Sequence, residues 1–300
     1  MRTPLRWLAA VLVTALAACQ APDTRAAAPP RIVAFGDVHG DLDATLRALR
    51  LAGAVDPDGQ WCGGRLVVVQ TGDQLDRGDD EAEILLLFER LAEQAAAAGG
   101  AFHSLLGNHE LMNVAGDFRY VTPGGFADFE GRVDFDPEDP ELARLEPAQR
   151  ARAAALRPGG HYARLLATHD VILVLEGNVF VHGGVLPAHL EYGVERINRE
   201  TRAWLRGEAG RPEIYAAPDS PIWARSYSLD PGPEAAVTAR AVLDALRAER
   251  MIVGHTIQEG GITNTCGGLV WCVDVGMAGA YGGPVEVLLI EGDQVRVLRE

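Results

Sequence analysis

The apolar positions of the chain alternate between short runs that suit buried strands and longer stretches with helical spacing. The first three expected strands are apolar runs followed by polar residues, at 32–35, 65–73 and, with a following loop, 101–110. Helices are expected between them, one near 41–51 with Asp41 as its N-cap and one over 79–98. Continuous apolar strands separated by helices predict an α/β fold with a buried, largely parallel sheet.

The pattern changes over residues 115–168, where strand-like runs stop. This segment is charged and rich in proline and alanine, and we interpret it as a helical insertion or cap, with a mobile surface excursion as the alternative. Its arginines at 144–157 are read as a solvated helix face. Strand patterns return as hairpins at 171–184 and 285–298, each turning at a glycine. The other expected helices and strands lie near 194–206, 234–249, 251–256 and 269–276.

The first 30 residues have the pattern of an export signal followed by a tether. Residues 1–18 combine two arginines with an apolar stretch too short to cross a membrane, as in a secretory signal peptide. The last four residues up to Cys19 resemble a bacterial lipobox, so we expect a periplasmic lipoprotein anchored to a membrane through lipidated Cys19. Residues 19–30 then form a flexible tether. Gln20 favours the outer over the inner membrane, and an ordinary signal with a soluble product is the alternative.

Net charge and cysteine content limit the binding partners and the redox compartment expected for the chain. The net charge is −15, which argues against a nucleic-acid partner because such proteins need a basic surface. Acidic surfaces keep proteins soluble, and some of these carboxylates could bind cations. Cys266 and Cys272 flank a Gly-Gly turn and could form a disulfide in an oxidising compartment, which would leave Cys62 unpaired. Three buried thiols are the alternative.

Polar residues follow five expected strands at the point where each strand ends. The stretches are "VAFGDVHGD", "VVVQTGDQLDRG", "SLLGNHE", "VFVHGG" and "MIVGHT". The carboxyl ends of neighbouring strands in α/β sheets converge on one crevice. We therefore expect six side chains to meet there: Asp37, His39, Asp73, Asn108, His182 and His255. Carboxylates and imidazoles without thiolates suit Mn, Fe or Zn, and cations would offset the repulsion between the carboxylates.

These motifs, in this order, resemble those of the calcineurin-like metallophosphoesterases of the Ser/Thr phosphoprotein phosphatase type. "SPIWARSY" (220–227) and "VDVGMAGAYGG" (273–283) are similar to the bacterial Shewanella-like branch. The resemblance runs over about residues 31–290 and is strong in short islands. It implies a metallophosphoesterase-type β-sandwich of mixed sheets flanked by helices, in four layers α/β/β/α, over residues 31–300.

The resemblance also implies two divalent metal ions that share one bridging carboxylate, Asp73. Asp37 and His39 would hold the first ion. The ligands of the second ion would be Asn108, His182 and His255. Manganese, iron and zinc all stay open as the identity of these ions.

The same resemblance implies how a phosphate ester would be cleaved. His109 matches the proton donor of the family, and Asp76 matches the carboxylate that orients it. Arg77 and, in a looser match, Arg225 would bind the phosphate beside Asn108. The expected reaction is attack of metal-activated hydroxide on a phosphate monoester, with His109 protonating the leaving group.

Two departures from the family pattern leave the substrate open. Leu106 stands where eukaryotic phosphatases usually carry Arg before "GNHE", and residues 115–168 are an insertion. Phosphate monoesters are the leading expectation, and phosphoproteins modified at Ser/Thr or Tyr are candidate substrates among them. Dinucleoside polyphosphate hydrolysis is the enzymatic alternative, and a non-catalytic, metal-containing binding lipoprotein is the alternative from another class. His109, Asp76 and Arg77 favour catalysis, because structural metal binding needs none of them.

Other polar residues near the motifs are read as structural. Glu110 is expected to be a structural hydrogen-bond partner. Asp274 and Tyr281 could line the rim of the site, and packing is the favoured expectation for both. Four histidines outside the motifs are given no role: His103, His161, His169 and His189.

Overall fold

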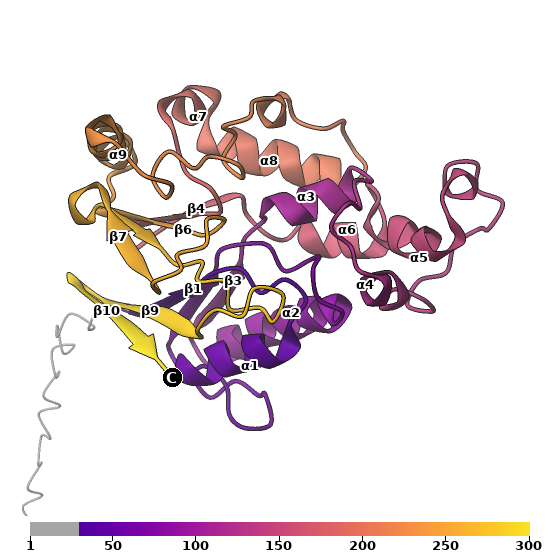
Figure 1. Cartoon of the computed structure of the whole chain (residues 1–300), viewed down its shortest axis with the longest axis horizontal. Coiled ribbons are helices and arrows are strands. Elements are labelled where there is room, and N and C mark those ends of the chain that lie inside the picture. The colour runs from indigo at the N-terminus through magenta and orange to yellow at the C-terminus, as the bar shows by residue number, and fades with distance from the viewer. Residues whose placement is uncertain (1–29) are drawn as a thin grey trace, which may run out of the picture.

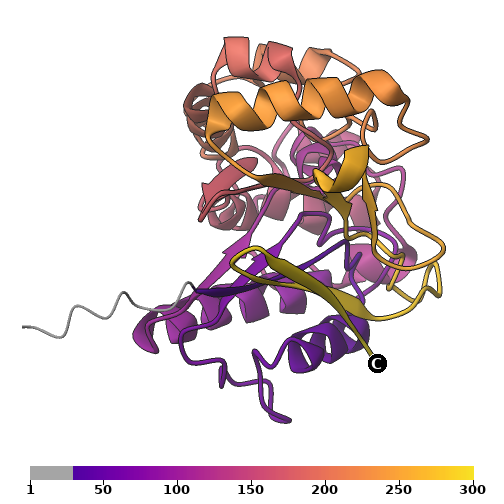
Figure 2. The same ribbon diagram turned by 90° about the vertical axis from the view of Figure 1, so that its left-hand side faces the viewer.

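Two five-stranded sheets face each other, and helices cover their outer faces (Figure 1, Figure 2). This computed structural model describes residues 30–300, so the expected signal (1–18) and lipidated Cys19 lie outside the described residues. The four-layer arrangement of mixed sheets implied by the family resemblance is confirmed. Within residues 30–300, no helix combines the length and the apolar character needed to cross a bilayer.

The first sheet has the strand order β10-β9-β1-β2-β3. Its strands are β1 (Arg31–Phe35), β2 (Val67–Gln70), β3 (Ala101–Ser104), β9 (Glu286–Glu291) and β10 (Gln294–Arg299). β1, β2 and β3 run parallel, and the β9–β10 hairpin joins β1 antiparallel. Helix α1 (Leu42–Leu51) contacts β9, and α2 (Glu81–Ala97) contacts β3. Asp41 caps α1 as expected, because its side chain accepts a hydrogen bond from Ala44 N.

The second sheet has the strand order β4-β5-β6-β8-β7. Its strands are β4 (Ile172–Leu175), β5 (Asn178–Val181), β6 (Arg250–Val253), β7 (Thr263–Thr265) and β8 (Val270–Cys272). β5, β6 and β8 run parallel between antiparallel edges. The helices on its outer side are α7 (Pro187–Tyr192), α8 (Val194–Leu205) and α9 (Pro233–Leu246), with short turns η2 (Glu213–Ala216) and η3 (Cys266–Gly268).

The single, largely parallel sheet expected from the apolar runs alone was wrong. Each sheet has three adjacent parallel strands, and the apolar pattern does not say which strands pair. The facing surfaces of the sheets share one core, in which Phe180 and Ile252 of the second sheet pack among apolar residues of β1, β2 and β9. At one end the sheets are linked directly, because Leu106 N donates to Asp170 O (2.9 Å).

The segment 115–168 is helical, as expected, and extends to one side of the sheets (Figure 1). It follows α3 (Asn108–Val114) and contains α4 (Pro123–Ala127), η1 (Leu142–Arg144), α5 (Pro147–Leu156) and α6 (His161–Leu166). "GNHE", expected to lie in a loop, instead begins α3. The reading of the arginines at 144–157 as a solvated face was wrong for Arg152, which is fully buried.

The three cysteines of the described chain follow neither expected pattern. Cys62 is exposed, Cys266 is partly buried and Cys272 is buried, and all three carry free thiols. The antiparallel register pairs Cys272 with Thr263, while Cys266 lies beyond the end of β7.

The backbone directly after β1 packs closely against the backbone directly after β8. A Cβ atom on Gly36 would lie 2.6 Å from Asp274 Cα and 2.6 Å from Val273 O. We expect Gly36→Ala to lower the free energy of unfolding by about 1–3 kcal/mol, because backbone would have to move. Urea denaturation measures this change. Gly210→Ala is the control, since no atom lies within 4 Å of a Cβ there, and its effect should stay below about 0.5 kcal/mol. Equal effects would contradict the close approach.

Candidate metal centre and active site

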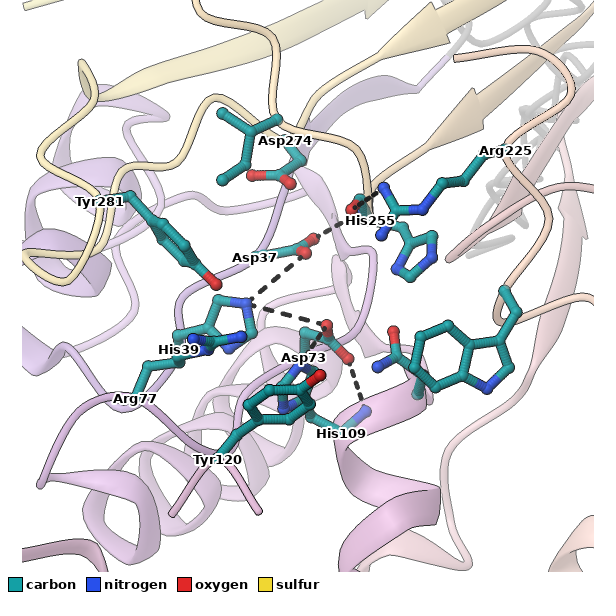
Figure 3. Close-up of a pocket in the computed structure, with 13 residues that line it drawn as sticks. Asp37, His39, Asp73, Arg77, His109, Tyr120, Arg225, His255, Asp274 and Tyr281 are labelled. Atoms are coloured by element: carbon teal, nitrogen blue, oxygen red, sulfur yellow. Dashed lines mark hydrogen bonds and ion pairs between the residues drawn. The ribbon is translucent and has the colours of Figure 1, made fainter. Parts of the chain in front are cut away.

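Loops from the carboxyl ends of strands in both sheets converge on one cavity of about 290 Å³ (Figure 3). Eight of the ten side chains predicted for the site line this cavity: Asp37, His39, Asp73, Arg77, Asn108, His109, Arg225 and His255. The other two, Asp76 and His182, are buried and contact His109 and Asp73 respectively. All ten predicted residues therefore lie at one site.

Both sheets contribute to the cavity. The first sheet supplies the loops after β1 and β2 and the start of α3, which carry Asp37, His39, Asp73, Asp76, Arg77, Asn108 and His109. The second sheet supplies His182 directly after β5 and His255 shortly after β6. The site thus lies across the junction of the two sheets.

Asp73 lies at the centre of the metal-binding donors. Its Oδ2 is 3.2 Å from His182 Nε2 and 3.8 Å from both His39 Nε2 and His109 Nε2. Two groups of three donors share this carboxylate, one with His39 and His109 and one with His182 and His255. Asp37 Oδ2 lies 3.9 Å from His39 Nε2 on the side of the first group.

Backbone carbonyls orient two of the histidines. The Nδ1 atoms of His39 and His182 donate to Leu75 O and Thr71 O, each at 2.9 Å, so their Nε2 atoms face the cavity donors. His182 Nε2 meets three acceptors: Asp73 Oδ2 (3.2 Å), Asn108 Oδ1 (3.0 Å) and His255 Nδ1 (3.2 Å). A proton on His182 Nε2 could be donated to only one of these acceptors, whereas a cation between them would interact with all of them.

Burial and crowding shift the pKa values of these groups. Burial raises the pKa of Asp37 well above its ordinary value, and the neighbouring carboxylates of Asp274 and Asp73 raise it further. Burial lowers the pKa of His39 to about 4 and that of His255 to about 2. The charged forms of these three groups are therefore disfavoured, and a bound cation would reverse this for Asp37. At Asp73 and His182 the mutual attraction of carboxylate and imidazole outweighs burial, so the pKa of Asp73 lies well below its ordinary value and that of His182 lies above it.

The donor set fits divalent metal ions. It consists of carboxylate, amide and imidazole donors without thiolate, which suits hard or borderline cations. His255 Nε2 is buried and has no hydrogen-bond partner among the described residues. The His/Asp clusters are thus compatible with the divalent metal binding that the sequence motifs implied.

His109 and Asp76 form a buried pair beside the metal donors. His109 Nδ1 donates to Asp76 Oδ2 at 2.5 Å, which leaves Nε2 on the side of Asp73. Burial lowers the pKa of His109, but the Asp73 and Asp76 carboxylates outweigh it, so the pKa lies above its ordinary value. This imidazole is therefore placed and charged as a proton donor requires.

Strained backbone surrounds the cavity. Among residues 30–300, nine non-glycine residues have positive φ, and five belong to the predicted site: His39, Asp73, Asp76, Arg77 and His255. Such conformations persist only where surrounding contacts hold them. Glu110 provides those contacts for the loop after β2, because its carboxylate accepts the backbone N–H groups of Asp73, Gln74, Leu75 and Gly107. Its predicted structural role is confirmed.

Two arginines face the same cavity (Figure 3). The Arg77 guanidinium lies 4.3 Å from the Tyr120 ring centroid and 5.6 Å from that of Tyr281, and its buried Nε has no partner among the described residues. Arg225 Nη1 donates to His255 O (3.0 Å) and to Thr256 Oγ1 (2.9 Å). Both side chains are held at the cavity wall, where an anionic group would meet them.

The cavity also contains residues that the sequence analysis did not assign to it. Asp274 and Tyr281 line the cavity, so the rim position that had been the less favoured alternative is the one the structure shows. Tyr120, Trp223 and Ile257 line it too and had not been singled out. Tyr120 comes from the start of the insertion, where no motif marks it.

Comparisons with known proteins indicate one family. A family model described as calcineurin-like phosphoesterase matches residues 30–259. The chain is 40% identical to Shewanella-like protein phosphatase 2 of Arabidopsis thaliana, over 92% of this chain and 79% of that protein. The crystal structure of a cold-active protein-tyrosine phosphatase of a psychrophilic Shewanella species has a TM-score of 0.70 at 26% identity, covering 90% of this chain and 80% of its own. A serine/threonine phosphatase of Saccharomyces cerevisiae, 16% identical, shares the fold with a TM-score of 0.55 over 90% and 80% of the two chains.

Mn²⁺ should stabilise the metal-depleted chain through Asp73. A ligand at 100 times its Kd adds about 2.7 kcal/mol of stability, which appears as a rise in Tm. We expect Asp73→Asn to lose most of this rise, because an amide replaces the carboxylate that both donor groups share. Asp41→Asn is the matched control, since either residue caps α1 well. Scanning calorimetry with and without Mn²⁺ measures the effect, and an equal rise in both variants would contradict a metal site at Asp73.

Proposed function

The chain belongs to the calcineurin-like phosphoesterase family, and from this membership we propose that it hydrolyses phosphate monoesters of phosphoproteins. One observation carries the proposal. Paired donor groups around Asp73, the His109–Asp76 pair and two arginines all belong to the same cavity. A protein that bound metal only for stability would need neither the arginines nor the buried acid–imidazole pair.

We propose that the site holds two divalent ions, with Mn, Fe or Zn as their identity. Asp37, His39 and Asp73 would hold one ion. The ligands of the other would be Asp73, Asn108, His182 and His255. When bound, such ions supply positive charge for the phosphoryl oxygens and generate a nucleophile from water at neutral pH. The three acceptors around His182 Nε2 support this occupancy.

Side chains of the protein itself would bind the ester and protonate its leaving group. Arg77 and Arg225 donate to the phosphoryl oxygens, for which the planar guanidinium is suited. The Asn108 amide, on the same cavity wall, assists them. His109 gives a proton to the oxygen of the leaving group, and Asp76 holds the imidazole so that Nδ1 stays occupied and Nε2 is free to act.

The aromatic residues of the cavity wall favour phosphotyrosine, which is an aryl ester, over phosphoserine. Tyr120, Trp223 and Tyr281 line the cavity, and two of their rings flank the Arg77 guanidinium. A phosphotyrosine ring would pack against such walls, whereas a phosphoserine side chain offers little surface to them. The protein tyrosine phosphatase named among the structural relatives is consistent with this preference.

We also propose that the enzyme acts outside the cytoplasm. The support is the sequence of residues 1–30, with an export signal, a lipobox-like stretch ending at Cys19 and a proline-rich tether. Lipidated Cys19 would anchor the enzyme to the outer membrane, with the catalytic domain in the periplasm.

Hydrolysis of para-nitrophenyl phosphate in the presence of Mn²⁺ tests the reaction. We expect turnover that chelation abolishes and added Mn²⁺ restores. His109→Ala should lower kcat by about 10²–10⁴-fold, because the proton donor is lost. His161→Ala, at an exposed histidine away from the cavity, is the control and should leave kcat unchanged. Turnover that survives Asp73→Asn combined with His109→Ala would refute the site.

A second measurement compares substrate classes. We expect kcat/KM for a phosphotyrosine peptide to exceed that for the matched phosphoserine peptide by about tenfold, given about 0.5–1.5 kcal/mol for each aromatic pair. Tyr281→Ala should reduce this ratio. Leu229→Ala, at an exposed residue that does not line the cavity, should not change it. Faster cleavage of a dinucleoside polyphosphate than of either peptide would favour that alternative enzyme class instead.

A further inference from the structure

Arg152, on insertion helix α5, is the largest fully buried side chain in the described part of the chain. None of the steps proposed above uses it. Removing a guanidinium from water is unfavourable unless its donors are paired, so the partners of this side chain indicate why it is there.

The partners of Arg152 come from segments that are far apart in the sequence. Its Nη2 donates to Asp76 Oδ1 (3.0 Å) and to Glu81 Oε2 (2.5 Å). Its Nε donates to Asn113 Oδ1 (2.8 Å), and its Nη1 donates to Gly125 O (2.9 Å). The planar fork thus links the loop after β2, α2, α3, α4 and α5, which the single ammonium group of a lysine could not do.

Besides the hydrogen bond from His109, the Asp76 carboxylate accepts hydrogen bonds from two members of this network. Its Oδ2 accepts from His109 Nδ1, while its Oδ1 accepts from Arg152 and from Asn113 Nδ2 (2.9 Å). Asn113 Nδ2 also donates to His109 O, and its own Oδ1 is held by Arg152. Arg152 therefore fixes Oδ1 of Asp76 both directly and through Asn113, which leaves Oδ2 in one orientation toward His109.

We propose that Arg152 is a positioning residue for the phosphatase reaction, holding Asp76 so that Asp76 holds the His109 imidazole in line with the leaving group. This inference rests on the proposed function, in which His109 is the proton donor. If Arg152 only anchored α5 to the rest of the protein, its ion pair with Glu81 would be sufficient, and the contacts to Asp76 and Asn113 would not be required. The insertion is thus part of the catalytic machinery, although no residue of α5 lines the cavity.

A leaving-group series separates positioning from a general loss of structure. Phenyl phosphate has a poor leaving group that needs a proton, whereas 2,4-dinitrophenyl phosphate has a good one that does not. We expect Arg152→Met to lower kcat for phenyl phosphate by about 10–100-fold, within the range of general acid catalysis, and for the dinitrophenyl ester by less than about threefold. KM should change little for either ester.

Two further variants keep the test decisive if Arg152→Met fails to fold. Arg152→Met combined with Glu81→Gln removes opposite buried charges together, and Arg152→Lys keeps the charge while losing the fork. In both variants kcat should fall more for phenyl phosphate than for the dinitrophenyl ester. The difference should be smaller in the lysine variant. Added to His109→Ala, Arg152→Lys should cause no further loss, because both changes act on one step.

Arg250→Met is the matched control. Arg250 is another buried arginine, on β6, and it donates to Asn178 Oδ1 and Gly292 O without contacting the cavity. Its loss should lower Tm but affect both esters equally. Equal losses on both esters in the Arg152 variants, or a loss that adds to that of His109→Ala, would overturn the proposal.

Proton NMR of metal-depleted protein gives a readout that does not need turnover. The His109 Nδ1 proton bonded to Asp76 should give a downfield resonance that shifts or disappears in the Arg152 variants and persists in Arg250→Met. An unchanged resonance in both folded Arg152 variants would overturn the positioning role. Absence of turnover in the wild-type chain, with that resonance present and sensitive to Arg152, would instead refute the proposed function and its catalytic use of the network.

Discussion

The site depends on one buried carboxylate that does no chemistry. Glu110 accepts four backbone N–H groups, three of them from consecutive residues of the loop after β2. Without an acceptor these buried groups would each be unsatisfied, at about 1–3 kcal/mol each. Their common partner keeps Asp73 at a φ of 59°, a conformation that a non-glycine residue rarely adopts, and so keeps the shared donor in the middle of the site.

The two sheets divide the work of building the cavity. The first supplies most of the carboxylates and the acid–imidazole pair, and the second supplies His182 and His255. Neither sheet alone presents both donor groups around Asp73, so the geometry depends on how closely the sheets meet. Gly36 and the backbone at Asp274 form that meeting point, and His255 N donates to Asp37 Oδ1 (3.2 Å) across it.

The sequence was informative where function is carried by short motifs at strand ends. Nine of the ten predicted site residues lie together because each strand-end motif stays beside its own strand, whichever strands pair. Arg225, the tenth, follows no strand and was predicted from the family resemblance alone. The sheet arrangement could not be read from apolar runs, since strands of both sheets look alike. Arg152 was misread because an arginine in an Ala/Arg helix is usually solvated, and its burial depends on Asp76 and Glu81, more than seventy positions away.

The chain leaves the sheets before α3 and returns after α6 at neighbouring positions, because Leu105 pairs with Asp170. A segment attached in this way can lengthen or shorten during evolution without disturbing either sheet. Arg152 limits that freedom, because its side chain must stay within hydrogen-bonding distance of Asp76. A descendant that lost this segment would expose Asp76 Oδ1 to solvent or would need a compensating substitution that brings another donor to it, so divergence of the segment and of its catalytic neighbours should be correlated.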